Sequence, residues 1–441
     1  MARKAQQSSV LTTYLNGKLV GRLRRAASGA IDFQYDPAWL SWTNAIPVSL
    51  SLPLREDRFI GARVTAVFDN LLPDDDAIRR RLAETTAAAG TDAFSLLSAV
   101  GRDCVGALQF LPDGEEGAVT GAIEGRKVSD REIEKIIGNL ARNPLGVACD
   151  DDFRISIAGA QEKTALLRWK RGWYVPHGGT ATTHIIKPQL GVLGNGIDMS
   201  QSVENEHFCL RLVAALGVPA AKTEIREFAG RRALVVERFD RVWSKDKSRL
   251  LRIPQEDMCQ ALGVPPTLKY ESDGGPSMKS VGDLLKESDE PDADRLLFLK
   301  AQVIFWLLSA TDGHAKNFSI RLGVGGQFRM TPLYDVMSAE PAHAAHQISD
   351  NKLKLAMAVG DNRHYVMKRI AARHFVQSGL SFGLAEKDSI AMLTELADTG
   401  SARIDGVLAT LPPDFPQQMA EIISGVAKER LGEIALMTEG A

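Results

Sequence analysis

The sequence has little that would build a metal framework or a disulfide framework. Only four of its 441 residues are cysteine, Cys104, Cys149, Cys209 and Cys259, and no two of them form a Cys-x-x-Cys pair. Cysteines so far apart argue against a zinc site or a disulfide-stapled fold and fit a reducing compartment. We therefore expect a cytoplasmic protein whose cysteines are small buried hydrophobic residues.

Long apolar runs and a dominant charge are also missing. No stretch of about 18 apolar residues occurs, so we expect no membrane-spanning helix, and the polar residues 1–9 do not resemble a signal peptide. The formal net charge is −2, so any contact with nucleic acid would need a local patch or a partner. The remaining composition, 44% hydrophobic and 24% charged, is that of a globular protein of two or three domains.

Three strings of ordinary protein kinases are absent: Gly-x-Gly-x-x-Gly, His-Arg-Asp and Asp-Phe-Gly. Kinase-like spacing is nevertheless present, because Asp312 and Asn317 stand as Asp-x-x-x-x-Asn and Asp335 follows a short strand-like run. In kinases this Asp orients or deprotonates the acceptor hydroxyl, while the Asn and a second Asp hold magnesium. The spacing is common by chance, and a polar loop that caps a helix is the alternative.

A turn of small residues at 158–163 precedes a strand-like run at 164–169. Small residues let backbone N–H groups approach phosphate oxygens, so this turn is a candidate phosphate loop. It is not a Walker A motif, and a plain β-hairpin turn is the alternative. The candidate loop consists of Ala158, Gly159, Ala160, Gln161, Glu162 and Lys163.

Lys187 ends the next β-branched run, where a kinase keeps the ammonium that pairs with the α- and β-phosphates. An exposed edge-strand lysine is the alternative. Glu206, or equally Glu204, in the helix expected over 201–216 could be its partner, unless both lie on the surface. An extended hinge at 236–241 would then read adenine, with the Phe239 ring on the base. These pieces follow one another in the order that a kinase requires.

Residues 10–35 combine short apolar runs with the turn pairs Asn16-Gly17 and Ser28-Gly29, which indicates an antiparallel β-layer. Alternating apolar residues in 47–54 predict a further strand. Beyond Trp243 the pattern turns helical, and 293–308 is apolar enough for a core helix that leads to Asp312. The other helices expected there are 254–262, 281–286, 363–377, 385–399, 403–409 and 415–432.

The predicted fold class is α+β. We expect a two-lobed protein-kinase-like fold with a β-rich N-lobe, an all-α C-lobe and an additional N-terminal β-rich subdomain. The interrupted pattern at 143–152 marks a boundary. The predicted domains are 1–145, the N-terminal subdomain; 146–243, the N-lobe with phosphate loop, strand lysine and hinge; and 244–441, the C-lobe with the catalytic loop.

Several long strings resemble one family. They are Phe68-Asp69-Asn70-Leu71-Leu72-Pro73, the segment 152–164, Pro254-Gln255-Glu256-Asp257-Met258-Cys259-Gln260, Tyr270-Glu271-Ser272-Asp273-Gly274-Gly275-Pro276 and the segment 310–319. Strings of this length are highly specific, and over nearly its whole length the chain resembles the HipA family, the serine/threonine kinase toxins of bacterial HipBA toxin–antitoxin systems.

The resemblance implies ATP and Mg²⁺ as cofactors, Asp312 as the catalytic residue, and Asn317 and Asp335 as metal ligands. Ser156 matches the serine that HipA proteins phosphorylate on themselves, which should switch the enzyme off; an ordinary strand serine is the alternative. The implied ATP-binding residues are Ala158, Gly159, Ala160, Gln161, Glu162, Lys163, Lys187, Glu237, Arg238, Phe239, His314, Ala315, Lys316 and Tyr334.

The resemblance also implies partners. The substrate would be glutamyl-tRNA synthetase, and a HipB-type helix-turn-helix antitoxin would carry the operator contact. Lys368, Arg369 and Arg373 are a possible additional DNA patch, with a solvated helix face as the alternative. Two other functions stay open: a small-molecule phosphotransferase of the aminoglycoside- or choline-kinase type, and a non-catalytic corepressor.

Overall fold

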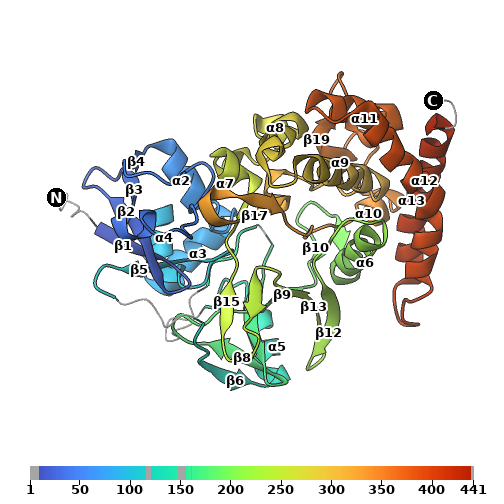
Figure 1. The fold of residues 1–441 in the computed structure, drawn as a ribbon. Coiled ribbons are helices and arrows are strands. Elements are labelled where there is room, and N and C mark those ends of the chain that lie inside the picture. Colours follow the sequence, from blue (N-terminus) through green and yellow to red (C-terminus); the bar gives the residue numbers. More distant parts are fainter. Residues whose placement is uncertain (1–8, 116–120, 148–154, 160, 439–441) are drawn as a thin grey trace.

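The computed structural model describes residues 9–115, 121–147, 155–159 and 161–438. Figure 1 shows three groups of elements: N-terminal strands and helices in blue, a sheet in green, and a mainly helical part in yellow to red. One hydrophobic core lies mostly in the helical part, and a second is shared by the N-terminal group and the green sheet. None of the helices in the described ranges is long and apolar enough to cross a membrane.

The N-terminal group contains β1 (Ser9–Leu15), β2 (Lys18–Arg25), β3 (Ile31–Tyr35), α1 (Pro37–Leu40), β4 (Phe59–Ile60), α2 (Ala62–Asp69), α3 (Asp76–Thr86), α4 (Ala93–Val100) and β5 (Leu108–Pro112). Its antiparallel sheet runs in the order β4-β3-β2-β1-β5. Asn16 and Gly17 have φ of 46° and 77° and join β1 to β2. The hairpin predicted from this pair is confirmed, because both residues accept the left-handed backbone of a two-residue turn.

Residues 47–54 do not form the predicted strand. They make a tight turn with a single bridge between Ser49 and Leu52. This turn is fixed by side-chain hydrogen bonds and not by the backbone ladder of a strand. The hydroxyl of Tyr35 donates to the carbonyl of Leu52, and the hydroxyl of Ser49 donates to the carbonyl of Gln260 at 3.3 Å. The apolar alternation therefore reflects a loop that is anchored on one face.

The next group contains β6 (Gly125–Val128), α5 (Asp130–Gly138), β7 (Thr164–Trp169), β8 (Gly172–Pro176), β9 (His184–Pro188), β10 (Gly191–Val192), β11 (Asp198–Met199), α6 (Ser202–Ala215), β12 (Thr223–Phe228) and β13 (Arg231–Glu237). Its antiparallel sheet runs in the order β12-β13-β9-β7-β8-β6, and α6 packs on β12 and β13. Strand β6 pairs with β8, so this sheet uses chain from both sides of residue 145.

The rest of the chain contains β14 (Arg241–Trp243), β15 (Leu250–Arg252), β16 (Gln255–Asp257), α7 (Met258–Leu262), α8 (Met278–Leu284), α9 (Pro291–Leu307), β17 (Ser319–Leu322), β18 (Phe328–Met330), α10 (Glu340–Ala344), β19 (Lys354–Val359), β20 (His364–Val366), α11 (Ala372–Ser381), α12 (Glu386–Leu408) and α13 (Gln417–Thr438). It is mainly helical, but the expected all-α C-lobe is corrected by two short sheets, β16-β17-β18 and β19-β20. Buried Ile320 and Leu322 alternate with exposed Arg321, a pattern too short to stand out among helical segments.

Three expected helices differ for reasons of packing. The segments 385–399 and 403–409 belong to one helix, α12, because Gly400 is a close contact and not a break: a Cβ there would lie 2.7 Å from Leu431 of α13. The helix expected over 363–377 starts only at Ala372, since the preceding residues pair with β19.

Candidate active site

A cavity of about 530 Å³ lies where the three groups of elements meet. Asn70 and Asp74 of the N-terminal subdomain form part of its wall. The sequence-predicted residues that line it are Ala158, Gly159, Gln161, Lys163, Lys187, Glu237, Arg238, Phe239, Asp312, His314, Lys316, Asn317, Tyr334 and Asp335. Ser156, Glu162 and Ala315 lie outside the lining, and Ala160 falls outside the described residues.

Lys187 on β9 sits between two carboxylates. Its Nζ donates to Glu206 Oε1 of α6 and to Asp335 Oδ1, each at 2.7 Å. Glu204, the other candidate partner, contacts Arg232 of β13 at 2.7 Å instead. Lys187 is thus a buried lysine held by a helix carboxylate, and not an exposed residue on an edge strand.

Burial and charge together set the ionisation of this triad. Burial alone would lower the pKa of Lys187, but the carboxylates of Asp335 and Glu206 outweigh it and raise that pKa. Burial of Asp335 is outweighed in turn by the ammonium groups of Lys187 and Lys163, which hold the pKa of Asp335 well below its usual range. The cavity therefore contains a full cation at Lys187 and a full anion at Asp335.

The loop after α9 presents Asp312 to the cavity. Asn317 Nδ2 donates to the carbonyl oxygen of Asp312 at 2.5 Å, and the His314 N–H donates to the same oxygen at 2.8 Å. Gly313 packs on the ring of Phe305, where a Cβ would lie only 2.2 Å from the ring carbon Cδ2. The loop backbone is therefore fixed, while the Asp312 side chain stays 58% exposed.

Tyr270 is a neighbour of Asp312 that the sequence pattern did not identify. Its hydroxyl donates to Asp312 Oδ1, and its ring meets the His314 ring edge-on, with centroids 4.9 Å apart. His314 Nε2 lies 3.8 Å from the same oxygen, and burial lowers the pKa of His314, so the ring is neutral near pH 7. The only signal in the sequence was the string 270–276, which no spacing rule connects with Asp312.

The candidate phosphate loop at 158–163 packs against the N-terminal subdomain. It is therefore not a plain β-hairpin turn. Gly159 has φ 106° and forms a parallel bridge with Pro73. Lys163 Nζ donates to the Ala158 carbonyl at 2.8 Å and would lie 2.5 Å from a Cβ on Gly159. Burial lowers the pKa of Lys163 to about 8. Glu162 points elsewhere, 3.6 Å from an arginine of α3.

Ser156 is enclosed just before this loop. Its side chain is buried, its hydroxyl donates to the carbonyl of Leu71 at 2.7 Å, and its N–H donates to the carbonyl of Asp103 at 2.9 Å. Both acceptors belong to the N-terminal subdomain. In this conformation the hydroxyl therefore does not reach the cavity.

The predicted hinge is not extended throughout, because strand β13 ends at Glu237 and residues 239–240 form a turn before β14. The Arg238 N–H donates to the carbonyl of Thr183 at 2.9 Å. Glu237, Phe239 and Tyr334 line the cavity, and the two aromatic rings lie 5.9 Å apart between centroids. Two aromatic rings that line one cavity are a suitable place for a planar base.

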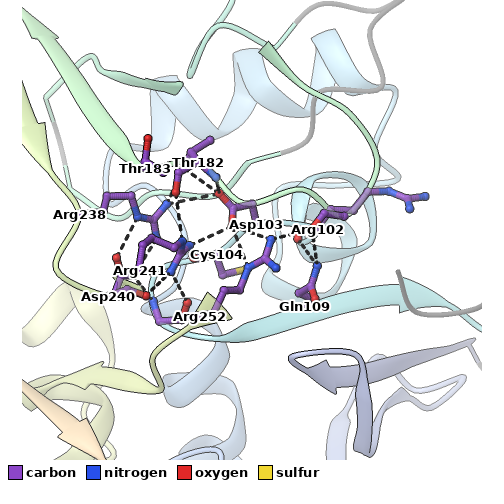
Figure 2. A network of polar contacts seen from close by, with 12 residues as sticks. Arg102, Asp103, Cys104, Gln109, Thr182, Thr183, Arg238, Asp240, Arg241 and Arg252 are labelled. Carbon is purple, nitrogen blue, oxygen red and sulfur yellow. Dashed lines mark hydrogen bonds and ion pairs between the residues drawn. The ribbon is translucent and has the colours of Figure 1, made fainter. Parts of the chain in front are cut away.

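The guanidinium of Arg238 is buried in the polar network shown in Figure 2. Asp103 stands at its centre and contacts Arg238, Arg241 and Arg252 at 3.4, 2.9 and 2.9 Å. Asp240 adds contacts to Arg238 and Arg241 at 2.8 and 2.9 Å. Burial opposes the charge on Asp103, but the arginines outweigh it and hold the pKa of Asp103 far below its usual range. The network ties the N-terminal subdomain to the hinge.

Lys316 joins the loop after α9 to the N-terminal subdomain. Its Nζ donates to Asn70 Oδ1 at 2.8 Å and lies 3.3 Å from carboxylate oxygens of Asp74 and Asp257. The Tyr334 hydroxyl donates to the Lys316 carbonyl at 2.7 Å. The ammonium thus lines the cavity while it is engaged with three partners, none of which the sequence pattern had marked as functional.

Asp335 and Asn317 suit a magnesium ion. Asp335 is ionised, and Asn317 uses its Nδ2 within the loop, which leaves its oxygen as the ligand atom. A few hard oxygen donors are typical of Mg²⁺ sites completed by substrate phosphates and water. Within the ranges that the structure covers, no group of three or more His, Cys, Asp or Glu could hold a metal unaided.

Known proteins are similar to this chain over most of its length. The family described as HipA-like C-terminal domain matches residues 155–404, and the HipA N-terminal domain matches residues 11–111. The chain is 37% identical over 355 residues to the kinase homologue Y4mE of Sinorhizobium fredii, covering 80% of this chain and 81% of that protein. It is 27% identical over 415 residues to the serine/threonine-protein kinase toxin HipA of Shewanella oneidensis, covering 91% and 90%.

A solved structure has the same fold. The chain is similar to a chain in the toxin–antitoxin complex of HipA, HipB and operator DNA from Shewanella oneidensis, with a TM-score of 0.81 and 25% identity over 97% of this chain and 99% of that chain. The two-lobed kinase-like fold and the family resemblance are confirmed. The chain belongs to the HipA family of kinases.

Proposed function

We propose that this protein is the serine/threonine kinase toxin of a type II toxin–antitoxin system and transfers the γ-phosphoryl group of MgATP to a protein hydroxyl. One observation carries the proposal. Lys187 and Asp335, bonded at 2.7 Å, line the same cavity as the exposed carboxylate of Asp312. Buried opposite charges next to an open carboxylate are costly for a scaffold and are what phosphoryl transfer needs.

Positioning and charge neutralisation supply most of the rate in this proposal. Asp312 accepts the proton of the acceptor hydroxyl, and Lys187, kept in place by Glu206, binds the α- and β-phosphates. Phe239 at the hinge would bind adenine. Asn317 and Asp335 would hold magnesium, which would neutralise charge on the phosphates.

Self-phosphorylation at Ser156 is the proposed off switch. Because the Ser156 hydroxyl is buried against the Leu71 carbonyl, its segment must leave this place before it can meet Asp312. A phosphate with up to two negative charges could not return, since the space is filled and the carbonyl oxygen repels it. The displaced loop would carry Lys163 away from the nucleotide.

The proposed substrate is glutamyl-tRNA synthetase, whose phosphorylation would lower aminoacylation and arrest growth. The proposed partner is a HipB-type antitoxin that carries the operator contact, in line with the complex known for a relative and with the net charge of −2 here. Arg369 and Arg373 could add contacts to DNA phosphates, whereas Lys368 already pairs with Asp350 at 2.7 Å. All of these interactions belong to the cytoplasm.

Asp312→Asn tests the proposal. Loss of the base should lower phosphate transfer by about 10²- to 10⁴-fold, and the chain should stay folded because the side chain is 58% exposed. The measurement is intact mass and phosphosite mapping after incubation with MgATP and glutamyl-tRNA synthetase. Asp405→Asn, an exposed carboxylate on α12, is the matched control and should transfer like the wild type.

Other outcomes identify the rival functions. Transfer to an aminoglycoside or choline but never to protein would make the chain a small-molecule phosphotransferase. Operon repression with antitoxin, but no transfer by the wild type to any acceptor, would make it a non-catalytic corepressor. Wild-type rates in Asp312→Asn would overturn the role of Asp312.

A further inference from the structure

The string 270–276 belongs to the family resemblance but has no part in the chemistry described so far. It forms a tight closed turn over Glu271–Asp273. Gly274 has φ 90°, the Gly275 N–H donates to the carbonyl of Tyr270 at 3.0 Å, and a Cβ on Gly275 would lie 1.8 Å from a backbone oxygen. Two glycines are therefore required, and the turn is stiff.

Both neighbours of Tyr270 are anchored. Lys269 Nζ lies 2.9 Å from a carboxylate oxygen of Asp74 in the N-terminal subdomain, and its carbonyl accepts from the Ala315 N–H of the catalytic loop at 3.2 Å. On the other side, Glu271 accepts from the Ala358 N–H of β19 at 2.6 Å. Tyr270 thus projects from a short segment whose residues on both sides, Lys269 and Glu271, are held by contacts.

Asp312, in contrast, has a fixed backbone and an open side chain. The bonds from Asn317 and His314 end on its carbonyl oxygen, not on its carboxylate. The hydroxyl of Tyr270 donates to Oδ1. Burial and the nearby charge of Asp312 raise the pKa of Tyr270, so the phenol remains a donor through the working pH range.

We propose that Tyr270 is a positioning residue for phosphoryl transfer: its hydroxyl fixes the carboxylate of Asp312 through Oδ1, so that Oδ2 faces the acceptor hydroxyl. In the step it serves, the acceptor proton passes to Oδ2, the acceptor oxygen bonds to the γ-phosphorus, and the bond from that phosphorus to the β–γ bridging oxygen breaks to release ADP. The inference rests on the proposed role of Asp312.

Tyr270→Phe is the test, because it removes the hydroxyl and keeps the ring against His314. We expect kcat to fall by about 10- to 100-fold, as for other residues that orient a reacting group, with the KM for ATP within about twofold. The readout is transfer of radiolabelled phosphate from ATP to glutamyl-tRNA synthetase and to the chain itself. Tyr174→Phe on β8, outside the cavity lining, is the matched control and should keep the wild-type rate.

A double variant separates positioning from a structural effect. If Tyr270 acts through Asp312, then Tyr270→Phe should cause no further loss in an Asp312→Asn background, because the group it positions is gone. An equal loss in that background, an unchanged kcat in the single variant, or a faster reaction would each overturn the inference while the proposed function stands. Full activity of Asp312→Asn alone would instead overturn the proposed function, and this inference with it.

Discussion

Three buried lysines near the cavity differ in the partners that their ammonium groups find. Lys187 and Lys316 each lie beside two carboxylates. Lys163 donates to the carbonyl of Ala158, a neutral oxygen. Burial therefore lowers the pKa of Lys163 to about 8, whereas for Lys187 and Lys316 the carboxylates outweigh burial and raise the pKa. Of the three, Lys163 is the residue that changes charge near physiological pH.

The affinity for ATP should fall above pH 8 because of Lys163. Bound phosphates favour the ammonium, so above its pKa of about 8 binding must take up a proton, which weakens affinity by up to about tenfold per pH unit. Below pH 8 Lys163 is already charged, so it adds no pH dependence to the affinity for ATP. By the same linkage, the buried charge of Lys163 destabilises the ligand-free protein below pH 8. This cost disappears as the pH rises from about 8 toward the pKa that Lys163 has in the unfolded chain.

Titration calorimetry with ATP between pH 7 and pH 9.5 checks this prediction. Lys163→Met should bind ATP more weakly at pH 7, and its ATP affinity should no longer fall above pH 8. Lys163→Arg should also lose this pH dependence, because a guanidinium stays charged. A slope that persists in Lys163→Met would assign the titration to another group.

Helix α6 decides which carboxylate meets the strand lysine. Glu204 and Glu206 are both buried, but two positions along an α-helix turn the side chain by about 200°. Glu206 therefore faces Lys187 on β9, and Glu204 faces Arg232 on β13. The orientation of one helix against the sheet makes Glu206 part of the site and pairs Glu204 with Arg232 instead.

The two glutamates form a matched pair for mutation. Glu206→Gln should lower kcat/KM for ATP by about 10- to 100-fold, because Lys187 loses the charge that holds it in place. Glu204→Gln changes the same atoms two residues away and should stay within a few-fold of the wild type. The check is steady-state kinetics at pH 7, with melting curves to confirm folding; equal losses in both variants would argue for a general effect of α6.

At the scale of the whole molecule, the N-terminal subdomain is built into the kinase. It shares a hydrophobic core with the N-lobe sheet. Asp103 reaches from it into the arginines that flank the hinge, as Figure 2 shows. Lys316 and Lys269 add contacts from the catalytic side. The cavity therefore depends on residues from the N-terminal subdomain as well as from both lobes.

Asp103→Asn should lower the free energy of unfolding by about 3–5 kcal/mol, because three buried guanidinium groups lose their shared anion. Urea unfolding followed by fluorescence measures the change, and we expect the subdomain and the N-lobe to unfold together. Glu224→Gln removes an anion from the exposed pair with Arg168 and should cost less than about 1 kcal/mol. A small effect of Asp103→Asn would mean that the arginines are satisfied by carbonyl groups alone.

Features that depend on nearby residues could be predicted from the sequence. The Asn16-Gly17 turn, the core helix α9 and the pairing of Asp312 with Asn317 in one loop follow from backbone preferences and short spacings, which act within a few residues. The order of the candidate phosphate loop, Lys187, the hinge and Asp335 could also be predicted, because the order of residues along the chain is given by the sequence.

The tertiary structure decided what depends on contacts between distant segments. The strand pattern of 47–54 folded as a loop because Tyr35 and Gln260 hold it. The guanidinium of Arg238 is engaged by Asp103, which is far away in sequence. The choice of Glu206, the burial of Ser156 and the contact of Tyr270 with Asp312 have the same origin. The sequence by itself determined the family, the kinase chemistry and the order of the site segments along the chain. Only packing across the three groups of elements decided where each side chain points, because those contacts join residues that no local pattern connects.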